Sequence, residues 1–305
     1  MNDSFWRQLQ EIAGEEHCSR QERMCRHTTF RIGGPAEYYV CPKRRQVAEI
    51  IALCQNHAVS WQVIGNGSNL LVGDKGISGL VIELGREASQ VTVEGCTIKA
   101  EAGALLSMVA GKAAAHGLTG MEFASGIPGT IGGAVVMNAG AYGGEMKQIV
   151  TKATVLTVEG REKVLSLEEL DFGYRRSWVL ENHAIVLDTE LVLEKGSPDA
   201  IREKMAQLRS QRSEKQPLEY PSAGSTFKRP EGYFAGKLIQ DAGLRGYRVG
   251  DAQISEKHCG FVINRGAATA SQIRQLISDV QKKVEEQFGV KLETEVRFLG
   301  EEEGY

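Results

Sequence analysis

The chain carries two glycine-rich segments that could arrange peptide N–H groups around an anion. The first is Ile64-Gly65-Asn66-Gly67-Ser68-Asn69-Leu70, which follows a short apolar stretch. Glycine backbones reach positive φ and approach a ligand closely, so successive N–H groups can point at a phosphate. The segment lacks the Lys of a Walker loop, and the residues after it are too rich in glycine for a long helix. We expect a phosphate-binding turn, with a tight surface turn as the alternative. The candidate cofactor-binding residues are Gly65, Asn66, Gly67, Ser68 and Asn69.

The second segment is longer, with seven glycines among the twenty residues from Ser125 to Gly144. Apolar side chains stand between the glycines, which predicts a buried loop with a flat apolar wall. Such a wall together with free N–H groups would suit a pyrophosphate joined to an aromatic ring system, and close packing of backbones is the alternative. The candidate cofactor-binding residues here are Gly126, Gly129, Thr130, Gly132, Gly133, Ala134, Asn138, Gly140, Ala141 and Tyr142.

The elements that must position these segments mix helices and strands. Apolar residues at helical spacing predict helices over 46–57, 105–116 and 271–288. Short apolar or alternating runs predict strands over 59–64, 79–84, 184–194, 260–264 and 292–298, and hairpins that turn at Glu94-Gly95 and Glu159-Gly160. Because strands and helices do not alternate strictly, the pattern favours α+β modules over a doubly wound sheet.

Three stretches organise the chain, over residues 1–92, 93–205 and 206–305. The polar segment from Arg209 to Pro221 is rich in Ser, Gln and charge, which predicts a linker. At 305 residues, the length is that of two or three domains.

Composition excludes several classes of protein. A formal net charge of -3 gives no basic field for nucleic acid, and no apolar run approaches the roughly 20 residues of a membrane span. The six cysteines show no C-x-x-C pair and no zinc spacing, so we expect reduced thiols, no metal site and a cytoplasmic protein. We also expect a monomer or weak oligomer.

Further short motifs share their order with those of one known family. They are Thr28-Thr29-Phe30-Arg31-Ile32-Gly33-Gly34, Phe172-Gly173-Tyr174-Arg175-Arg176-Ser177, Ser222-Ala223-Gly224-Ser225-Thr226-Phe227-Lys228, Ala235-Gly236-Lys237-Leu238-Ile239 and Leu292-Glu293-Thr294-Glu295-Val296-Arg297. Together with the two glycine segments, they resemble the UDP-N-acetylenolpyruvoylglucosamine reductases, also called UDP-N-acetylmuramate dehydrogenases. The resemblance covers nearly the whole chain. The short spacing between Arg175 and Ser225 resembles the class that lacks a substrate-capping tyrosine loop.

The resemblance implies a two-domain FAD-binding cradle of the vanillyl-alcohol-oxidase type plus a C-terminal α+β substrate domain. It makes 1–92 and 93–205 the two FAD-binding subdomains and 206–305 the substrate-binding domain. It also implies that NADPH reduces FAD, and that hydride then passes from the flavin N5 to the enolpyruvyl ether of UDP-N-acetylglucosamine-enolpyruvate. The product is UDP-N-acetylmuramate, a peptidoglycan precursor.

Three residues match the family's catalytic groups. Arg175 would stabilise the developing enolate, Ser225 would donate the proton, and Glu295 would help to stabilise the enol. Arg176 next to Arg175 leaves the register open. The residues expected to bind substrate are Tyr174, Arg229, Lys237, Arg245 and His258.

Two other functions stay open at this point. Another FAD oxidoreductase on the same cradle could oxidise an alcohol or hydroxy acid, although none of the six histidines lies in the glycine segments to act as its base. A non-catalytic nucleotide-binding module is the alternative from a different class.

Overall fold

The computed structural model describes residues 3–300, and the chain divides into two compact units. Unit 1 is formed by Met1–Arg20, Tyr38–Asn66 and Gly79–Arg212, and unit 2 by Gln21–Glu37, Gly67–Ser78 and Ser213–Tyr305. Unit 2 therefore includes two segments from the N-terminal part of the chain. The three consecutive stretches expected from the sequence do not group these segments with the C-terminal part. A boundary between FAD-binding subdomains at residue 92 falls inside unit 1 and stays a prediction.

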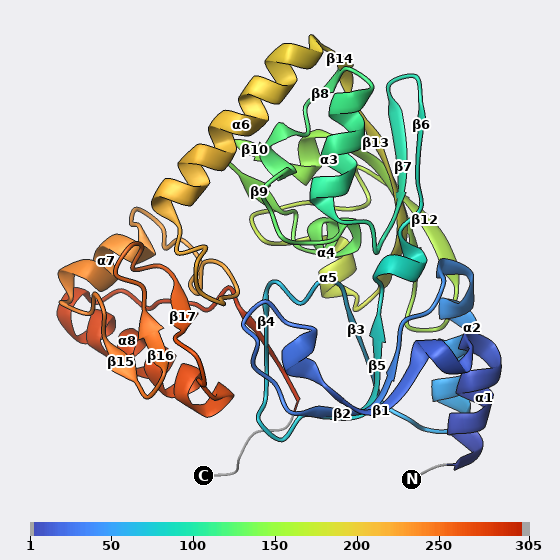
Figure 1. Ribbon diagram of the computed structural model, residues 1–305, viewed down its shortest axis with the longest axis horizontal. Coiled ribbons are helices and arrows are strands. Elements are labelled where there is room, and N and C mark those ends of the chain that lie inside the picture. The colour runs from blue at the N-terminus through green and yellow to red at the C-terminus, as the bar shows by residue number, and fades with distance from the viewer. Residues whose placement is uncertain (1–2, 301–305) are drawn as a thin grey trace. The chain divides into compact units, whose positions relative to one another are not determined.

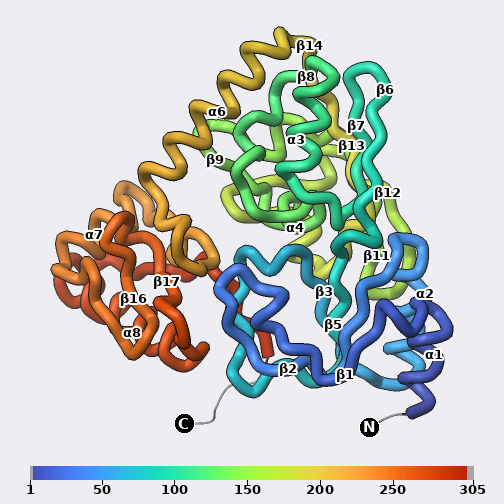
Figure 2. The backbone as a smooth tube through the Cα atoms, in the orientation of Figure 1, coloured from blue at the N-terminus to red at the C-terminus, as the bar shows by residue number. Residues whose placement is uncertain are grey.

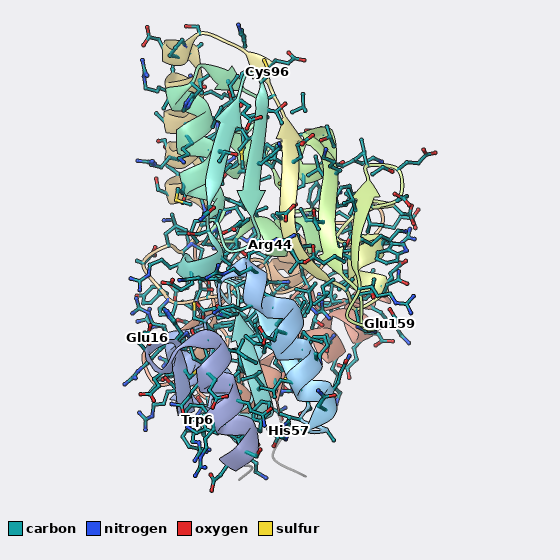
Figure 3. The ribbon with its side chains drawn as sticks, turned by 90° about the vertical axis from the view of Figure 1, so that its right-hand side faces the viewer. Trp6, Glu16, Arg44, His57, Cys96 and Glu159 are labelled. Atoms are coloured by element: carbon teal, nitrogen blue, oxygen red, sulfur yellow. The ribbon has the colours of Figure 1, made fainter. Side chains whose placement is uncertain are left out.

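A four-stranded sheet with the strand order β1-β2-β5-β3 lies mostly in unit 1, and one end of each of β1, β2 and β5 belongs to unit 2. The predicted helix over 46–57 is confirmed as α2, because Val47, Ile50, Ile51 and Cys54 are all fully buried on one face. Helix α1, which the sequence analysis did not predict, lies beside α2 (Figure 3). The bounds are α1 Asp3–Ala13, α2 Val47–Asn56, β1 Cys18–Arg23, β2 Pro35–Val40, β3 Trp61–Ile64 and β5 Ile77–Glu83.

The other part of unit 1 is an antiparallel five-stranded sheet in the order β12-β11-β13-β7-β6 (Figure 1). Both predicted hairpins are confirmed, and their turns contain Gly95 at φ 63° and Gly160 at φ 79°. Helix α4 packs against β13. The strands are β6 Val91–Glu94, β7 Thr97–Glu101, β11 Val150–Leu156, β12 Glu162–Ser166 and β13 Ile185–Val192. The helices are α3 Leu106–Ala115, α4 Ile131–Val136 and α5 Trp178–Glu181, and the small strands are β8 Leu118–Thr119, β9 Gly140–Ala141, β10 Gly144–Glu145 and β14 Glu194–Lys195.

The linker predicted over 209–221 is wrong for its first half. Helix α6, Pro198–Lys215, continues through those residues (Figure 1). Only Ile201 and Leu208 of its side chains are buried, so the helix has almost no apolar periodicity from which it could be predicted.

Unit 2 has its own core around helix α8, Ala270–Phe288. The helix begins with a capping box between Thr269 and Gln272 and ends at Gly289, whose φ is 68°. Asp74 also binds this N-terminus, since its carboxylate accepts from the N–H groups of Ala270 at 2.7 Å and Ser271 at 2.9 Å. The other elements are α7 Ala235–Asp241 and a three-stranded sheet of β15 Arg248–Val249, β16 Ala252–Ile254 and β17 Val262–Asn264.

The strand predicted over 292–298 is shorter in the structure. Leu292 and Val296 are buried as its alternation requires, but only β18, Arg297–Leu299, forms a ladder. Its partner is β4, Leu70–Val72, and the two strands run parallel side by side (Figure 2). The C-terminal end of unit 2 is thus paired with a segment that precedes it by more than 200 residues.

Within residues 3–300, no helix is both long and apolar enough to cross a membrane, and no group of three metal-binding side chains is assembled. All six cysteines are free thiols. Burial raises the pKa of Cys18 and of Cys54 to about 12, which keeps these thiols protonated and unreactive.

Candidate active site

The first glycine segment begins in unit 1, where it meets the second. Asn66 Nδ2 donates to the carbonyl of Pro128 at 2.7 Å. A Cβ at Gly65 would lie 2.3 Å from Thr130 Oγ1, so only glycine allows this approach. The structure therefore brings the two predicted cofactor segments into direct contact.

The rest of the first segment belongs to unit 2. Gly67 has φ 58°, and a Cβ there would lie 2.0 Å from the carbonyl oxygen of His27. Asn69 Nδ2 donates to the carbonyl of Glu295 at 3.0 Å, and the N–H of Arg297 donates back to the carbonyl of Asn69. The segment is therefore held against the strand that carries a predicted catalytic residue.

Four successive peptide N–H groups in this segment are available to a ligand. Across the described part of the chain, the N–H groups of Asn66, Gly67, Ser68 and Asn69 donate to no protein acceptor. Unpaired N–H groups are costly when buried, and anions are their natural partners. This is the arrangement expected of a phosphate-binding turn.

The second glycine segment differs from the expectation of a loop with many free N–H groups. Its centre is α4, whose first turn is capped by Thr130 Oγ1, which accepts from the N–H of Gly133 at 3.4 Å. The N–H groups of Ile131, Gly132 and Ala134 donate to backbone carbonyls at 2.8–2.9 Å. Close packing explains one of these glycines, because a Cβ at Gly132 would lie 2.8 Å from that of Ala102. The N–H groups of Gly126 and Gly129 donate to no acceptor among residues 3–300.

Asn138, a predicted cofactor-binding residue, is engaged inside the protein. It is 1% exposed, and its Nδ2 donates to Glu145 Oε2 and to the carbonyl of Gly173, both at 3.0 Å. Its Oδ1 accepts from the N–H of Lys147 at 2.9 Å. The observed contacts therefore make Asn138 a support for the β9–β10 turn and for the segment that leads to Arg175. The predicted residues Gly140 and Ala141 form β9, and the exposed Tyr142 follows at φ 54°.

The contacts of Arg175 and Arg176 differ in a way that bears on the open register. Arg176 is an exposed residue clamped between Glu181 and Asp171, and these carboxylates raise the pKa of its guanidinium. Arg175 is half-buried, has φ 54°, and places its guanidinium carbon 5.1 Å from the ring centroid of Tyr174. Non-glycine residues at positive φ are strained and concentrate at functional sites. The geometry supports Arg175 as the functional arginine and Arg176 as the structural one.

The end of α4 fixes both sides of Arg175. On one side Asn138 binds the Gly173 carbonyl, and on the other Ser177 Oγ donates to the carbonyl of Val136 at 2.7 Å. Ser177 is fully buried and also caps α5. The second glycine segment thus positions the predicted catalytic arginine.

In unit 2, the structure joins the segments of Ser225 and Glu295. The intervening contact is Thr226, which is fully buried and whose carbonyl accepts from the N–H of Glu295 at 2.8 Å. Thr226 Oγ1 also accepts from the N–H of Val262, and Ser225 itself bridges Phe261. Ser225 is exposed and Glu295 is half-buried, so both predicted catalytic residues can reach a ligand from a rigid support.

Three predicted substrate residues gather around the loop from Glu256 to Gly260. Arg245 donates to the carbonyl of Glu256 and to Gln240 Oε1. His258 Nδ1 accepts from the N–H of Gly260 at 3.0 Å, and burial lowers the pKa of this imidazole. Lys237 pairs with Asp241 in α7, and a Cβ at its neighbour Gly236 would lie 3.3 Å from His258 Cε1.

Arg229 lies in another part of unit 2. Its guanidinium carbon is 4.1 Å from the ring centroid of Phe234, and its Nε donates to the carbonyl of Tyr233. Phe234 is 61% exposed and Tyr233 is 48% exposed. The sequence analysis passed over both aromatics because a lone Tyr-Phe pair carries no periodic signal.

Two family models match the chain. Residues 216–299 match the C-terminal domain of UDP-N-acetylenolpyruvoylglucosamine reductase, and residues 35–166 match an FAD-binding domain. The chain is 55% identical to the UDP-N-acetylenolpyruvoylglucosamine reductase of Agathobacter rectalis, over 99% of this chain and 100% of the relative. It is 52% identical to that of Lachnoclostridium phytofermentans, over 99% of each chain.

Solved structures give the same result. The crystal structure of UDP-N-acetylenolpyruvylglucosamine reductase from Thermus caldophilus superposes with a TM-score of 0.79 and 36% identity, over 91% of this chain and 97% of that one. An alkyldihydroxyacetonephosphate synthase superposes at 0.51 with 14% identity, over 64% of this chain and 41% of that one, which shows a shared fold alone. The expected fold, an FAD cradle of the vanillyl-alcohol-oxidase type followed by a C-terminal α+β domain, is confirmed.

The residues present fit FAD. The N–H groups of residues 66–69, which donate to no acceptor in the described part of the chain, can bind the phosphates of an anionic dinucleotide. The protein is an FAD-dependent oxidoreductase. On the identity of its relatives over their full length, the chain belongs to the UDP-N-acetylenolpyruvoylglucosamine reductase family.

Proposed function

We propose that the protein reduces the enolpyruvyl ether of UDP-N-acetylglucosamine-enolpyruvate to UDP-N-acetylmuramate with NADPH as the reductant. The observation that carries this proposal is the joining of the Ser225 and Glu295 segments through Thr226, in a chain that is 55% identical to a named reductase. The reaction would serve peptidoglycan precursor synthesis in the cytoplasm, with the protein a monomer or weak oligomer.

The cofactor is held by residues of the two glycine segments. The N–H groups of Asn66 to Asn69 supply donors for its phosphates, and those of Gly126 and Gly129 supply two more. When bound, FAD supplies the hydride chemistry that no side chain can perform. We assign residues 1–92 and 93–205 to cofactor binding and 206–305 to the substrate, as the family resemblance implies.

Arg175 stabilises the negative charge that develops beside the substrate carboxylate. A guanidinium binds a carboxylate through two parallel hydrogen bonds, and it is preorganised here by the anchors at Gly173 and Ser177. Such a preorganised group contributes about 3–4 kcal/mol to the stability of a charged transition state.

Ser225 donates the proton that completes the reduction. Hydride adds to the terminal methylene carbon, the electron pair moves to the adjacent carbon, and the hydroxyl proton of Ser225 goes to that carbon. The serine oxygen then regains a proton from water. Glu295, whose backbone is fixed on the same support, helps to stabilise the enol.

The remaining predicted residues recognise the nucleotide sugar. Lys237 and Arg245 offer positive charge to the diphosphate, and His258, kept neutral by burial, can donate a hydrogen bond from Nε2. Arg229 and Tyr174 complete the proposed set. Arg229 lies beside the exposed ring of Phe234, and Tyr174 is itself an exposed aromatic residue beside Arg175.

The test is anaerobic. Purified protein should show a flavin spectrum, bleach on titration with NADPH, and regain its absorbance on addition of UDP-N-acetylglucosamine-enolpyruvate, with UDP-N-acetylmuramate recovered as product. Bleaching that this substrate does not reverse would refute the proposed function, and reversal by an alcohol's oxidised form instead would favour an alcohol oxidoreductase.

The role of the serine has its own test. Ser225→Ala should keep the rate of flavin reduction by NADPH and slow the second half-reaction by roughly 10²-fold or more, because it removes a general acid. Stopped-flow absorbance separates the two half-reactions. Equal slowing of both would remove Ser225 from the role of proton donor.

A further inference from the structure

Arg212 packs against Gly126 of the second glycine segment, although it belongs to none of the sequence motifs described above. It is near the end of α6, Pro198–Lys215, and its half-buried side chain lies where a side chain at Gly126 would be. A Cβ at Gly126 would be 3.2 Å from Arg212 Cδ, 3.6 Å from Nη1 and 3.9 Å from Nε. The glycine therefore makes room for the guanidinium.

This guanidinium has no protein partner. Across residues 3–300, Arg212 makes no hydrogen bond and no ion pair, whereas the similarly buried Arg44 binds both Glu162 and Asp188. Burial lowers the pKa of Arg212, and the one neighbour that offsets this is Tyr142. A partly desolvated charge with no counter-charge is destabilising, so a ligand is expected to supply its partner.

The surroundings identify the ligand. Gly126, whose N–H donates to no described acceptor, and the exposed Tyr142 both lie within residues 35–166, the stretch that matches an FAD-binding domain. We infer that Arg212 binds an anionic group of FAD beside Gly126, and that α6, outside the matched stretch, contributes this residue to the cofactor site. Two groups of FAD share the required chemistry: the pyrophosphate, and the pyrimidine edge of the flavin, which gains negative charge on reduction. The inference needs only FAD binding, and not the proposed substrate or reductant.

The experiment compares Arg212→Gln with Arg212→Lys and Arg209→Gln. Arg209 is an exposed residue of the same helix, so Arg209→Gln removes the same charge without touching the segment. Apoprotein is titrated with FAD by fluorescence, and the midpoint potential of each holoprotein is measured. Arg212→Gln should weaken FAD binding about 10- to 100-fold, the range for loss of charged hydrogen bonds, with Arg212→Lys in between and Arg209→Gln within about twofold.

The two measurements also separate the two groups of FAD. Loss of a pyrophosphate contact weakens FAD but not riboflavin, and leaves the potential unchanged. Loss of a contact to the flavin edge weakens riboflavin as well and makes the potential more negative, by about 30 mV for each tenfold preference lost for the reduced form.

A second variant keeps the inference falsifiable if Arg212→Gln folds poorly. Gly126→Ala should displace the side chain of Arg212 and weaken FAD binding several-fold when Arg212 is present. In the Arg212→Lys background it should have no such effect, because the guanidinium that the new methyl group would displace is already absent. Unchanged FAD affinity and potential in Arg212→Gln, or equal losses in Arg209→Gln, would overturn the inference. A protein that binds FAD normally but fails to reduce the enolpyruvyl ether would refute the proposed function and leave Arg212 unaffected.

Discussion

The two glycine segments resemble each other in composition but use their backbones differently. Around Gly67, four N–H groups in a row donate to no acceptor within the described residues 3–300, and the glycine itself is needed for a positive φ and for contact with His27. Around Gly132, the N–H groups of Ile131 and Gly132 already donate to the carbonyls of Ala104 and Ala102, and the glycine allows a helix to approach Ala102. Glycine density therefore has two physical causes, ligand approach and close packing, and only hydrogen-bond accounting tells them apart.

The largest effect should come from the first segment. Gly67→Ala combines a strained φ with a Cβ 2.0 Å from a carbonyl oxygen, so we expect about 3 kcal/mol or more of lost unfolding free energy and almost no bound FAD. Urea unfolding and the ratio of flavin to protein absorbance measure these. Normal FAD content would mean that the turn can change shape without loss of the cofactor. Gly95→Ala, at a positive φ with open space around it, is the control for strain alone.

Asn138 tests whether the second segment supports catalysis more than it binds FAD. Asn138→Ala leaves the N–H of Lys147 without a partner and removes one of the two donors to the carbonyl of Gly173, which keeps the N–H of Arg176. This should cost about 1–3 kcal/mol of unfolding free energy. Because Gly173 leads to Arg175, kcat should fall about tenfold or more while the Kd for FAD changes by less than about threefold. A large loss of FAD affinity with unchanged kcat would restore the original interpretation of Asn138 as a direct ligand.

A smaller effect is expected at Gly132. Gly132→Ala places a Cβ 2.8 Å from that of Ala102, so overpacking should cost about 1–2 kcal/mol of unfolding free energy. Since the N–H of Gly132 already donates to Ala102, the affinity for FAD should change little. If this variant loses FAD as completely as Gly67→Ala, the proposed difference between the segments does not hold.

The smallest effect concerns a third use of glycine, which is to make room for a side chain. A Cβ at Gly260 would lie 2.9 Å from His258 Cε1, and the burial this permits lowers the pKa of His258. The unfolded chain therefore binds a proton more readily than the folded one. The contribution of this group to stability is complete above the unfolded pKa near 6.5 and is lost as pH falls through the lower folded value. His258→Asn should flatten that part of the stability curve, as measured by urea unfolding at a series of pH values.

Sequence patterns predicted the elements whose burial is periodic. Helices α2 and α8 and both hairpins follow from apolar spacing and from glycines at positive φ. Helix α6 could not be predicted, because only two of its side chains are buried and the rest of its sequence shows no apolar periodicity. For the same reason, no sequence pattern singled out Arg212. Nor could the engagement of Asn138 be predicted, because its three partners lie at distances of 7 to 35 residues along the chain, where no local pattern operates.

The motifs predicted candidate site residues, but they could not predict what each residue contacts. Sequence alone cannot distinguish the roles of the neighbouring residues Arg175 and Arg176. The structure distinguishes them, because Arg176 binds the carboxylates of Asp171 and Glu181. Likewise, the order of motifs placed Ser225 and Glu295 in one site, while the hydrogen bond through Thr226 that joins them depends on pairing across about 70 residues.

The parallel pairing of β4 with β18 has a consequence for folding during translation. Leu70–Val72 is synthesised more than 200 residues before its partner strand, Arg297–Leu299. The same holds for Asp74, which must wait for the helix that begins at Ala270. Until those later residues are made, these early segments of unit 2 stay without their native neighbours. The unit can therefore be completed only after β18 has been synthesised, and the long chain that must close slows this step.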